Sequence, residues 1–325
     1  MKLASTLLGG LLCSAALALA PLSAAQAQAT GKNLTIIIPF TPAGAVDNLA
    51  RVLGQELAKQ DKYATVVVDN RPGAGGQVAM NGIKSAKPDG NTIFVGHGGA
   101  FVLNRFVYDQ LTYDPDRDLA PISTLSKAPV FLLVPGDSKA NSLQDLITEG
   151  KKRSLSFGSP GVGTETQLAG EVFKVRAGIQ GEHIPYKGAG PALIDLASGR
   201  LDFMFDVLIG SSAFLQDGRV KVLAAASDER SEFLPDTPTF KELGVDGIEF
   251  SLWFAAAAPA GTPADVVDEL SQDIAKAMNQ PHVIQEFAKV GLQISTSTPA
   301  EMSKLIQDDV AMFDALLQDK NIKIK

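Results

Sequence analysis

The chain opens its first half with a short apolar run followed by a helical pattern. Leu34 to Phe40 is apolar and β-branched, which is typical of a strand buried on both faces. Pro42 and Gly44 interrupt this run, and apolar residues then recur at helical spacing from Ala45 onward. The pattern predicts a strand, a loop of small residues and a helix N-terminus, where unpaired backbone N–H groups and the helix dipole can hold an anion. A plain strand-to-helix turn would give the same pattern.

A second segment has the same plan in the middle of the chain. Leu155 to Gly158 predicts a short strand, and residues 159–164, Ser-Pro-Gly-Val-Gly-Thr, predict a loop. Thr164 and Gln167 have the spacing of a capping box at the start of a helix that runs through Lys174. Two such loops could hold one acidic ligand between them, although each could equally do no more than turn the chain.

Strands and helices alternate along the rest of the chain. We expect further strands or extended segments at 64–69, 91–96, 121–135, 183–186, 201–206, 219–226 and 250–259. We expect further helices at 78–85, 142–150, 191–199, 262–278, 281–291 and 301–317. This alternation predicts an α/β fold with mainly parallel sheets flanked by helices.

The first 29 residues have the pattern of a secretory signal peptide. Lys2 precedes an apolar core from Leu7 to Leu19, and Ala-Gln-Ala sequences follow up to Ala29. The single cysteine, Cys13, lies in this segment, so the mature chain can form no disulfide. The segment predicts export to a bacterial periplasm, and its apolar core is too short for a good membrane anchor.

The mature chain of about 300 residues exceeds the size at which one core usually keeps growing, which predicts two lobes. We expect residues 30–128 and 255–325 to form the first lobe and residues 129–254 the second. Two extended crossings would join the lobes, near 127–130 and 251–255. The formal net charge of -7 becomes -8 when Lys2 leaves with the leader, and no basic cluster is present, so no nucleic acid partner is expected.

The residues that catalysis would need are poorly arranged for it. The histidines are isolated in the sequence, with no metal-ligand spacing: His97, His183 and His282. The segment around Ser159 lacks the spacing of a nucleophile elbow, and Gly161-x-Gly163 lacks the rest of a dinucleotide fingerprint. The sequence therefore predicts no enzyme, no cofactor and no metal. A periplasmic hydrolase that uses Ser159 or His97 is the less favoured alternative.

Several motifs together resemble those of one protein family. Residues 39–51, Pro-Phe-Thr-Pro-Ala-Gly-Ala-Val-Asp-Asn-Leu-Ala-Arg, resemble the P-F-x-x-G-G-x-x-D-x-x-A-R signature of the Bug-type receptors. These are the solute-binding proteins of tripartite tricarboxylate transporters. Residues 70–76, Asn-Arg-Pro-Gly-Ala-Gly-Gly, and the segment 159–173 are similar to further family motifs. The match continues to residues 259–263 and covers essentially the whole mature chain.

The resemblance implies a two-lobed periplasmic binding protein of type II. Such a protein closes around a small organic carboxylate and delivers it to membrane permease subunits; we expect a monomer. Backbone N–H groups, hydroxyls and waters of the two loops would hold the carboxylate. The ligand-binding residues that the resemblance implies are Thr41, Pro42, Ala43, Gly44, Asp47, Ser159, Gly163, Thr164, Gln167 and Asp206.

Some of these assignments have structural alternatives. Asp206 could meet a hydroxyl or amine of the ligand, or could be a cap or a strand-end acid that faces water. Asp47 could serve only to complement a helix N-terminus. Ala43 stands where the family usually has glycine, so either this position needs no positive φ or the loop is altered. Gln167 stands where histidine is common, which could change the ligand. A receptor that signals to a membrane sensor kinase fits the sequence equally well.

Overall fold

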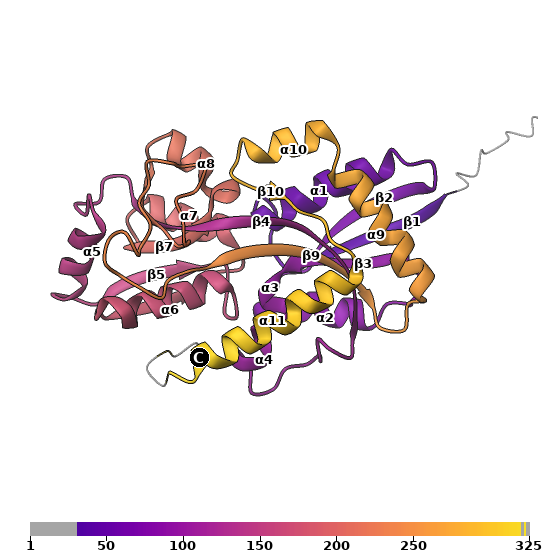
Figure 1. Ribbon diagram of the computed structural model, residues 1–325, viewed down its shortest axis with the longest axis horizontal. Coiled ribbons are helices and arrows are strands. Elements are labelled where there is room, and N and C mark those ends of the chain that lie inside the picture. The colour runs from indigo at the N-terminus through magenta and orange to yellow at the C-terminus, as the bar shows by residue number, and fades with distance from the viewer. Residues whose placement is uncertain (1–30, 320–321, 323–325) are drawn as a thin grey trace, which may run out of the picture. The chain divides into compact units, whose positions relative to one another are not determined.

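The strands form two parallel groups that are connected through long antiparallel strands (Figure 1). The computed structural model describes residues 31–319 and 322, and the predicted signal peptide lies outside them. The first parallel group consists of β1 (Lys32–Ile38), β2 (Tyr63–Asn70) and β3 (Thr92–His97). The second consists of β5 (Leu155–Ser159), β6 (Gly181–Pro185) and β7 (Phe203–Val207).

Two long strands, β4 (Leu119–Pro135) and β9 (Ser251–Pro259), connect these groups. β9 lies between β3 and β4 and is antiparallel to both. β4 pairs with β9 as far as Pro129 and pairs with β7 from Val130 onward. The strand order is β2-β1-β3-β9-β4-β7-β5-β6. The extended segments expected at 121–135 and 250–259 are these two strands, and the lobe boundaries assigned to them stay a prediction.

Two further strands pair with β4. They are β8 (Val220–Ala225) and the two-residue β10 (Gln293–Ile294), both antiparallel to it. β4 therefore has neighbours on both sides in each half of its length. Its central position requires apolar side chains on both faces, and the run from Val130 to Val134 is fully buried.

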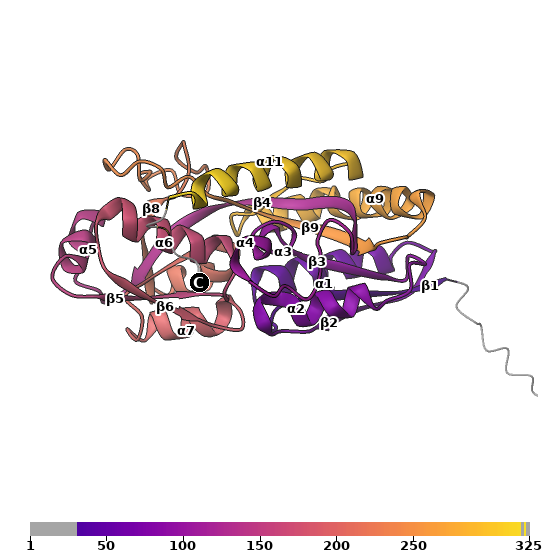
Figure 2. The same cartoon turned by 90° about the horizontal axis from the view of Figure 1, so that it is seen from below.

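Helices cover the faces of this sheet, and α9 and α11 lie along β4 (Figure 2). The helices near the first parallel group are α1 (Ala45–Ala58), the 3₁₀ turn η1 (Ala74–Gly76), α2 (Gln77–Lys84), α3 (Gly98–Phe101) and α4 (Asn104–Val107). Those of the second group are α5 (Leu143–Gly150), α6 (Glu165–Ala177), α7 (Ala189–Ala197) and α8 (Leu208–Gln216). The C-terminal helices are α9 (Ala264–Met278), α10 (Pro281–Ala288) and α11 (Pro299–Leu317). In the part of the chain described, no helix has the length and apolar character to cross a membrane.

The predicted elements are present with ends shifted by a few residues. The short elements η1, α3, α4 and β10 were not expected, and neither was the longer helix α8. Its sequence, Leu-Ile-Gly-Ser-Ser-Ala-Phe-Leu-Gln, begins after Val207, which offers no capping side chain. The segment is broadly apolar and lacks the polar face from which a helical period is recognised. This matters for the site, because α8 begins directly after Asp206.

Candidate ligand-binding site

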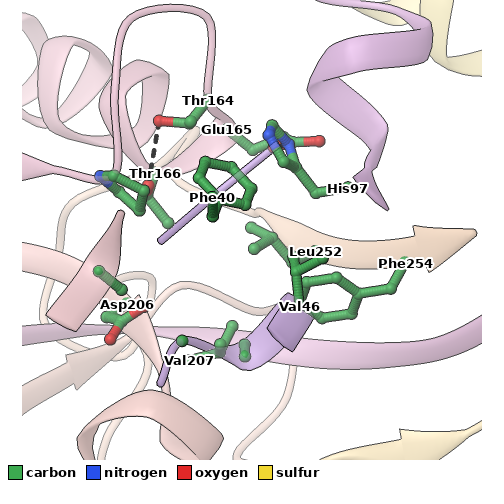
Figure 3. A pocket seen from close by; sticks show the side chains of 14 residues that line it. Phe40, Val46, His97, Thr164, Glu165, Thr166, Asp206, Val207, Leu252 and Phe254 are labelled. Carbon is green, nitrogen blue, oxygen red and sulfur yellow. Dashed lines mark hydrogen bonds and ion pairs between the residues drawn. The ribbon is translucent and has the colours of Figure 1, made fainter. Parts of the chain in front are cut away.

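A cavity lies where the carboxyl ends of strands from both parallel groups meet (Figure 3). Of the residues that the sequence predicted, it is lined by Gly44, Thr164 and Asp206. Most of the other lining side chains are apolar, and Leu252 and Phe254 come from β9. An adjoining hollow shares Phe40, His97, Pro160 and Thr164 with it and is also lined by Lys187.

The N-termini of several helices converge on this cavity. Gly44 and Thr164 are the N-caps of α1 and α6, Val207 is the N-cap of α8, and Ala189 is the first residue of α7. All of these residues line the cavity, and no side chain caps α1, α7 or α8. The first N–H groups of a helix have no partner within it and carry the positive end of its dipole. The cavity is thus suited to hold a negative group, although none of the residues that line it is Lys or Arg.

The first loop is shaped by Asp47, which does not line the cavity. Asp47 Oδ2 accepts hydrogen bonds from the Ala43 N–H at 3.0 Å and from Arg51 Nε at 2.9 Å, and Asn70 bonds its other oxygen. Burial opposes ionisation of Asp47, but these hydrogen bonds outweigh it and hold its pKa below the usual value. Asp47 therefore fixes the loop from behind.

Ala43 adopts a φ of 73°, in the left-handed region. The possibility that this position needs no positive φ is therefore wrong. Alanine is strained there by roughly 1 kcal/mol, and the hydrogen bond to Asp47 helps to hold it. Thr41 is directed elsewhere: its N–H and its Oγ1 each donate to the Lys187 carbonyl oxygen at 3.2 Å. Pro42 does not line the cavity.

The second loop is more thoroughly bonded than the first. Thr164 Oγ1 accepts from the Gln167 N–H at 3.3 Å and donates to the Gly161 carbonyl oxygen at 2.8 Å. Gln167 Oε1 accepts from the Gly163 N–H at 2.8 Å. In the predicted capping box this side chain would instead have accepted from the Thr164 N–H, so only the threonine half of the box is present. Gln167 is 3% exposed and lies outside the cavity lining, where it supports the loop.

Ser159 is fully buried and also lies outside the lining. Its Oγ accepts from the Gly161 N–H at 3.1 Å and lies 2.7 Å from His183 Nε2. Burial, with a smaller effect of Lys174, lowers the pKa of His183 to about 4. Ser159 and His183 therefore form a neutral pair that supports the second loop.

Three contacts join the two loop regions across the cavity. The first is the contact of Thr41 with Lys187 described above. In the second, Tyr108 Oη donates to the Val162 carbonyl oxygen at 3.2 Å. His97 Nδ1 lies 2.6 Å from Glu165 Oε2, and both side chains are buried. Glycines allow this approach, since a Cβ on Gly163 would overlap the Asn104 side chain. The two halves of the cavity wall are therefore in direct contact.

Asp206 ends β7 and begins the turn into α8. It is 3% exposed, and its Oδ2 has no hydrogen-bond partner. Burial raises the pKa of Asp206 to about 7, and a hydrogen bond from the Val207 N–H offsets this only in part. Figure 3 shows Asp206 on the opposite side of Phe40 from His97 and Glu165. Because the side chain is buried, the expectation that Asp206 faces water at a strand end is wrong.

Several lining residues were not predicted from the sequence. His97 and Glu165 carried a partial signal, because His97 ends a strand at the same sheet edge and Glu165 directly follows the predicted cap. Leu252 and Phe254 had no local signal, because their place at the cavity depends on the long-range pairing of β9 with β3 and β4.

A family model described as "Tripartite tricarboxylate transporter family receptor" matches residues 49–322. The chain belongs to this receptor family. BugT of Bordetella pertussis is 31% identical over 298 residues, which is 90% of this chain and 91% of BugT. A protein of the tcbD-tcbE intergenic region of Pseudomonas sp. (strain P51) is 33% identical and covers 88% of this chain and 85% of its own. The predicted resemblance to Bug-type receptors is confirmed.

Several solved structures are similar to this chain and have the same fold. The periplasmic binding protein BugD is 29% identical, with a TM-score of 0.85 over 90% of this chain and 98% of BugD. The Rpa4515 protein of R. palustris, solved with adipate, is 30% identical, with a TM-score of 0.85 over 88% of this chain and 96% of its own. MatC from Rhodopseudomonas palustris, solved with malate, is 27% identical, with a TM-score of 0.82 over 87% and 98%. The predicted fold class, that of a periplasmic binding protein with α/β sheets, is confirmed.

Proposed function

We propose that this protein is a periplasmic, non-enzymatic receptor that binds a small organic carboxylate in the cavity described above. The mature receptor forms when residues 1–29 are removed. It then passes its ligand to the permease of a tripartite tricarboxylate-type transporter. The family, and the adipate and malate bound by two similar solved proteins, support a carboxylate as the bound group. Of the residues that the resemblance implied, Gly44, Thr164 and Asp206 line the cavity directly. We infer that Thr41, Asp47, Ser159, Gly163 and Gln167 act by shaping the loops.

The observation that carries this proposal is the convergence of helix N-termini on a cavity with apolar walls. A carboxylate there would accept hydrogen bonds from the first N–H groups of α1 and α6, which lie on opposite sides of it. Each bond to a charged acceptor is worth about 1.5–3 kcal/mol, and exclusion of water strengthens it. Contacts such as that of Tyr108 with Val162 would form as the protein closes on its ligand.

The arrangement of Ser159 and His183 argues against the hydrolase alternative. The pair has the 2.7 Å contact of a nucleophile and its base, but Ser159 is fully buried and is not among the residues that line the cavity. In a catalytic triad, a carboxylate bonds the histidine and orients it. Among the residues described, no carboxylate forms such a hydrogen bond with His183. His97 contacts Glu165, and within residues 31–319 no serine or threonine hydroxyl bonds to it.

Titration calorimetry on refolded, ligand-free mature protein tests the proposal. We expect at least one compound in a panel of dicarboxylates, tricarboxylates, amino acids and aromatic acids to bind with micromolar or tighter affinity. Absence of heat with every acid would contradict it. Pull-down from bacterial membranes with and without the ligand then separates a permease partner from a sensor kinase.

A proline substitution tests the role of the helix amides. Ala45→Pro removes one N–H at the first residue of α1, where proline fits because Gly44 before it is extended. We expect the affinity to fall about 10-fold or more while the helix is retained. Ala264→Pro is the matched control, because it makes the same change at the exposed first residue of α9, outside the cavity. Equal affinities of the two variants would contradict amide recognition by α1.

A further inference from the structure

The cavity contains two buried acceptor oxygens that no group of the protein satisfies. One is Asp206 Oδ2 and the other is Glu165 Oε1, and both side chains are 3% exposed and line the cavity. A buried polar atom without a partner costs about 1–3 kcal/mol, and more when it is charged. Oxygens of this kind at a ligand cavity are explained most simply if the ligand brings the missing donor.

The two acceptors are not equivalent. Glu165 has a partner for its other oxygen, because Oε2 lies 2.6 Å from His97 Nδ1. Asp206 receives only the Val207 N–H and has no ion pair. It also lies on the far side of Phe40 from His97 (Figure 3). Asp206 is therefore the acceptor with the greater need of an external donor.

Electrostatics also separate the classes of ligand that this end of the cavity would accept. Two like charges 4 Å apart repel by about 4 kcal/mol at an effective dielectric constant of 20, and opposite charges attract by the same amount. In the described part of the chain, no Lys or Arg lines the cavity, and Lys187 is the only one that lines the adjoining hollow. A ligand carboxylate beside Asp206 would therefore lack a cationic side chain there, whereas an ammonium group would gain an ion pair.

We infer that the physiological ligand is an amino acid or related amino-carboxylate, whose ammonium group binds Asp206 while its carboxylate binds the helix N-termini. This inference rests on the proposed function and narrows the class of acid. The apolar walls, which include Val46, Leu252 and Phe254, favour a ligand whose carbon skeleton is apolar between or beyond these two groups. Asp206 sets specificity by selecting this donor.

Acids that share one carbon skeleton test this inference. Hexanoate, 2-aminohexanoate, 6-aminohexanoate and adipate differ only in whether and where they carry an amine or a second carboxylate. We expect one of the two amino acids to bind at least 10-fold more tightly than both hexanoate and adipate. Asp206→Asn should weaken that amino acid at least 10-fold and leave hexanoate within about 3-fold.

The outcomes separate this inference from the proposed function. Tighter binding of adipate or hexanoate than of both amino acids would overturn the inference and leave the carboxylate receptor intact. An amino acid affinity that Asp206→Asn does not change would also overturn it. Failure of every acid, including the wider panel, would overturn the proposed function itself.

Proton exchange gives a second readout. The elements packed against β7 carry few other titratable groups, and only one of these groups, Glu165, lines the cavity. The titratable groups are Lys127 on β4, Glu165, Glu171, Lys174 and Arg176 on α6, and Asp195 on α7. Of the lining residues beyond these elements, His97 is titratable. Because the pKa of Asp206 is about 7 in the empty cavity, an ammonium ligand should lower it and release a proton at pH 7. Calorimetry in buffers of different ionisation enthalpy should show release in the wild type and none in Asp206→Asn. Proton uptake with the amino acid would contradict the ion pair.

The stability of the ligand-free protein should depend on the same carboxyl. Its pKa is raised from 3.8 to about 7 on folding, so the folded state binds the proton more tightly and loses stability as pH rises through this interval. We therefore expect Asp206→Asn to melt at a higher temperature than the wild type at pH 8, with a smaller difference at pH 5. A variant less stable than the wild type at both pH values would contradict an unpartnered Asp206.

Discussion

The two loops that begin α1 and α6 have similar sequences of small residues but are held in different ways. The first loop has no side-chain cap on its helix and depends on Asp47 and Arg51 behind it. The second has a threonine cap, a glutamine bonded to its backbone and a buried serine beneath it. The first loop thus leaves all the initial amides of its helix to a ligand, whereas the second uses one of them for its own support.

This difference suggests a division of labour between the loops. The second loop is preorganised, because its bonds are complete before a ligand arrives. The first loop includes a strained alanine and partly exposed residues, so it can adjust at lower cost. Substitutions in the second loop should act through stability and closure, whereas replacing the uncapped Gly44 of the first loop should act on affinity directly.

The largest effect is expected for Gly163→Ala in the second loop. Gly163 has a φ of 84°, and its added Cβ would overlap Asn104, whose Nδ2 is held by Gly75 and Tyr113. We expect the loops to be unable to close fully and ligand affinity to fall more than about 100-fold, as measured by calorimetry. Gly178→Ala is the matched control, with a φ of 62° and no atom within 4 Å of the new Cβ. Equal affinities of the two variants would show that the close approach is not needed.

Thr164→Ala should have the next largest effect, mainly on stability. The change removes the cap of α6 and leaves the Gln167 N–H without its partner. We expect a loss of about 1–2 kcal/mol in the free energy of unfolding, measured by chemical denaturation. Thr164→Ser keeps the hydroxyl and should recover most of this loss. If serine were as destabilising as alanine, the cap would not be the cause.

Gly44→Ser should convert the first loop toward the plan of the second. Gly44 is extended, with a φ of -95°, and has no atom within 4 Å of an added Cβ. A serine hydroxyl could cap α1 and gain a few tenths of a kcal/mol in stability. It would take an amide from the ligand, so we expect the affinity to fall about 3- to 10-fold. Gly44→Ala controls for the added carbon, and its affinity should be the higher of the two.

The smallest effect is expected for Ala43→Gly. Glycine adopts the φ of 73° without strain, but it also gains freedom in the unfolded chain. The balance should stabilise the protein by about 0.5 kcal/mol, seen as a higher denaturation midpoint with an unchanged slope. A lower midpoint would mean that the loop stores no strain at Ala43.

The sequence allowed the local parts of this structure to be predicted, and the limits have a physical cause. The starts of α1 and α6 carry capping and loop signals within a few residues, so both were placed correctly. Roles inside the loops were less accessible, because whether Asp47 faces the ligand or the Ala43 N–H depends on the path of the backbone. The walls formed by β9 depend on pairing between residues more than a hundred positions apart, and no local pattern encodes that.

The length of β4 has a mechanical consequence. One strand of 17 residues changes its partner from β9 to β7 between Pro129 and Val130, with no break in the chain. If one half of the sheet rotates against the other, hydrogen-bonded strands must therefore twist. Such strands resist twisting more than a flexible linker would. The residence time of a bound ligand would then depend on the stiffness of the backbone at Pro129 and Val130, which do not contact the ligand.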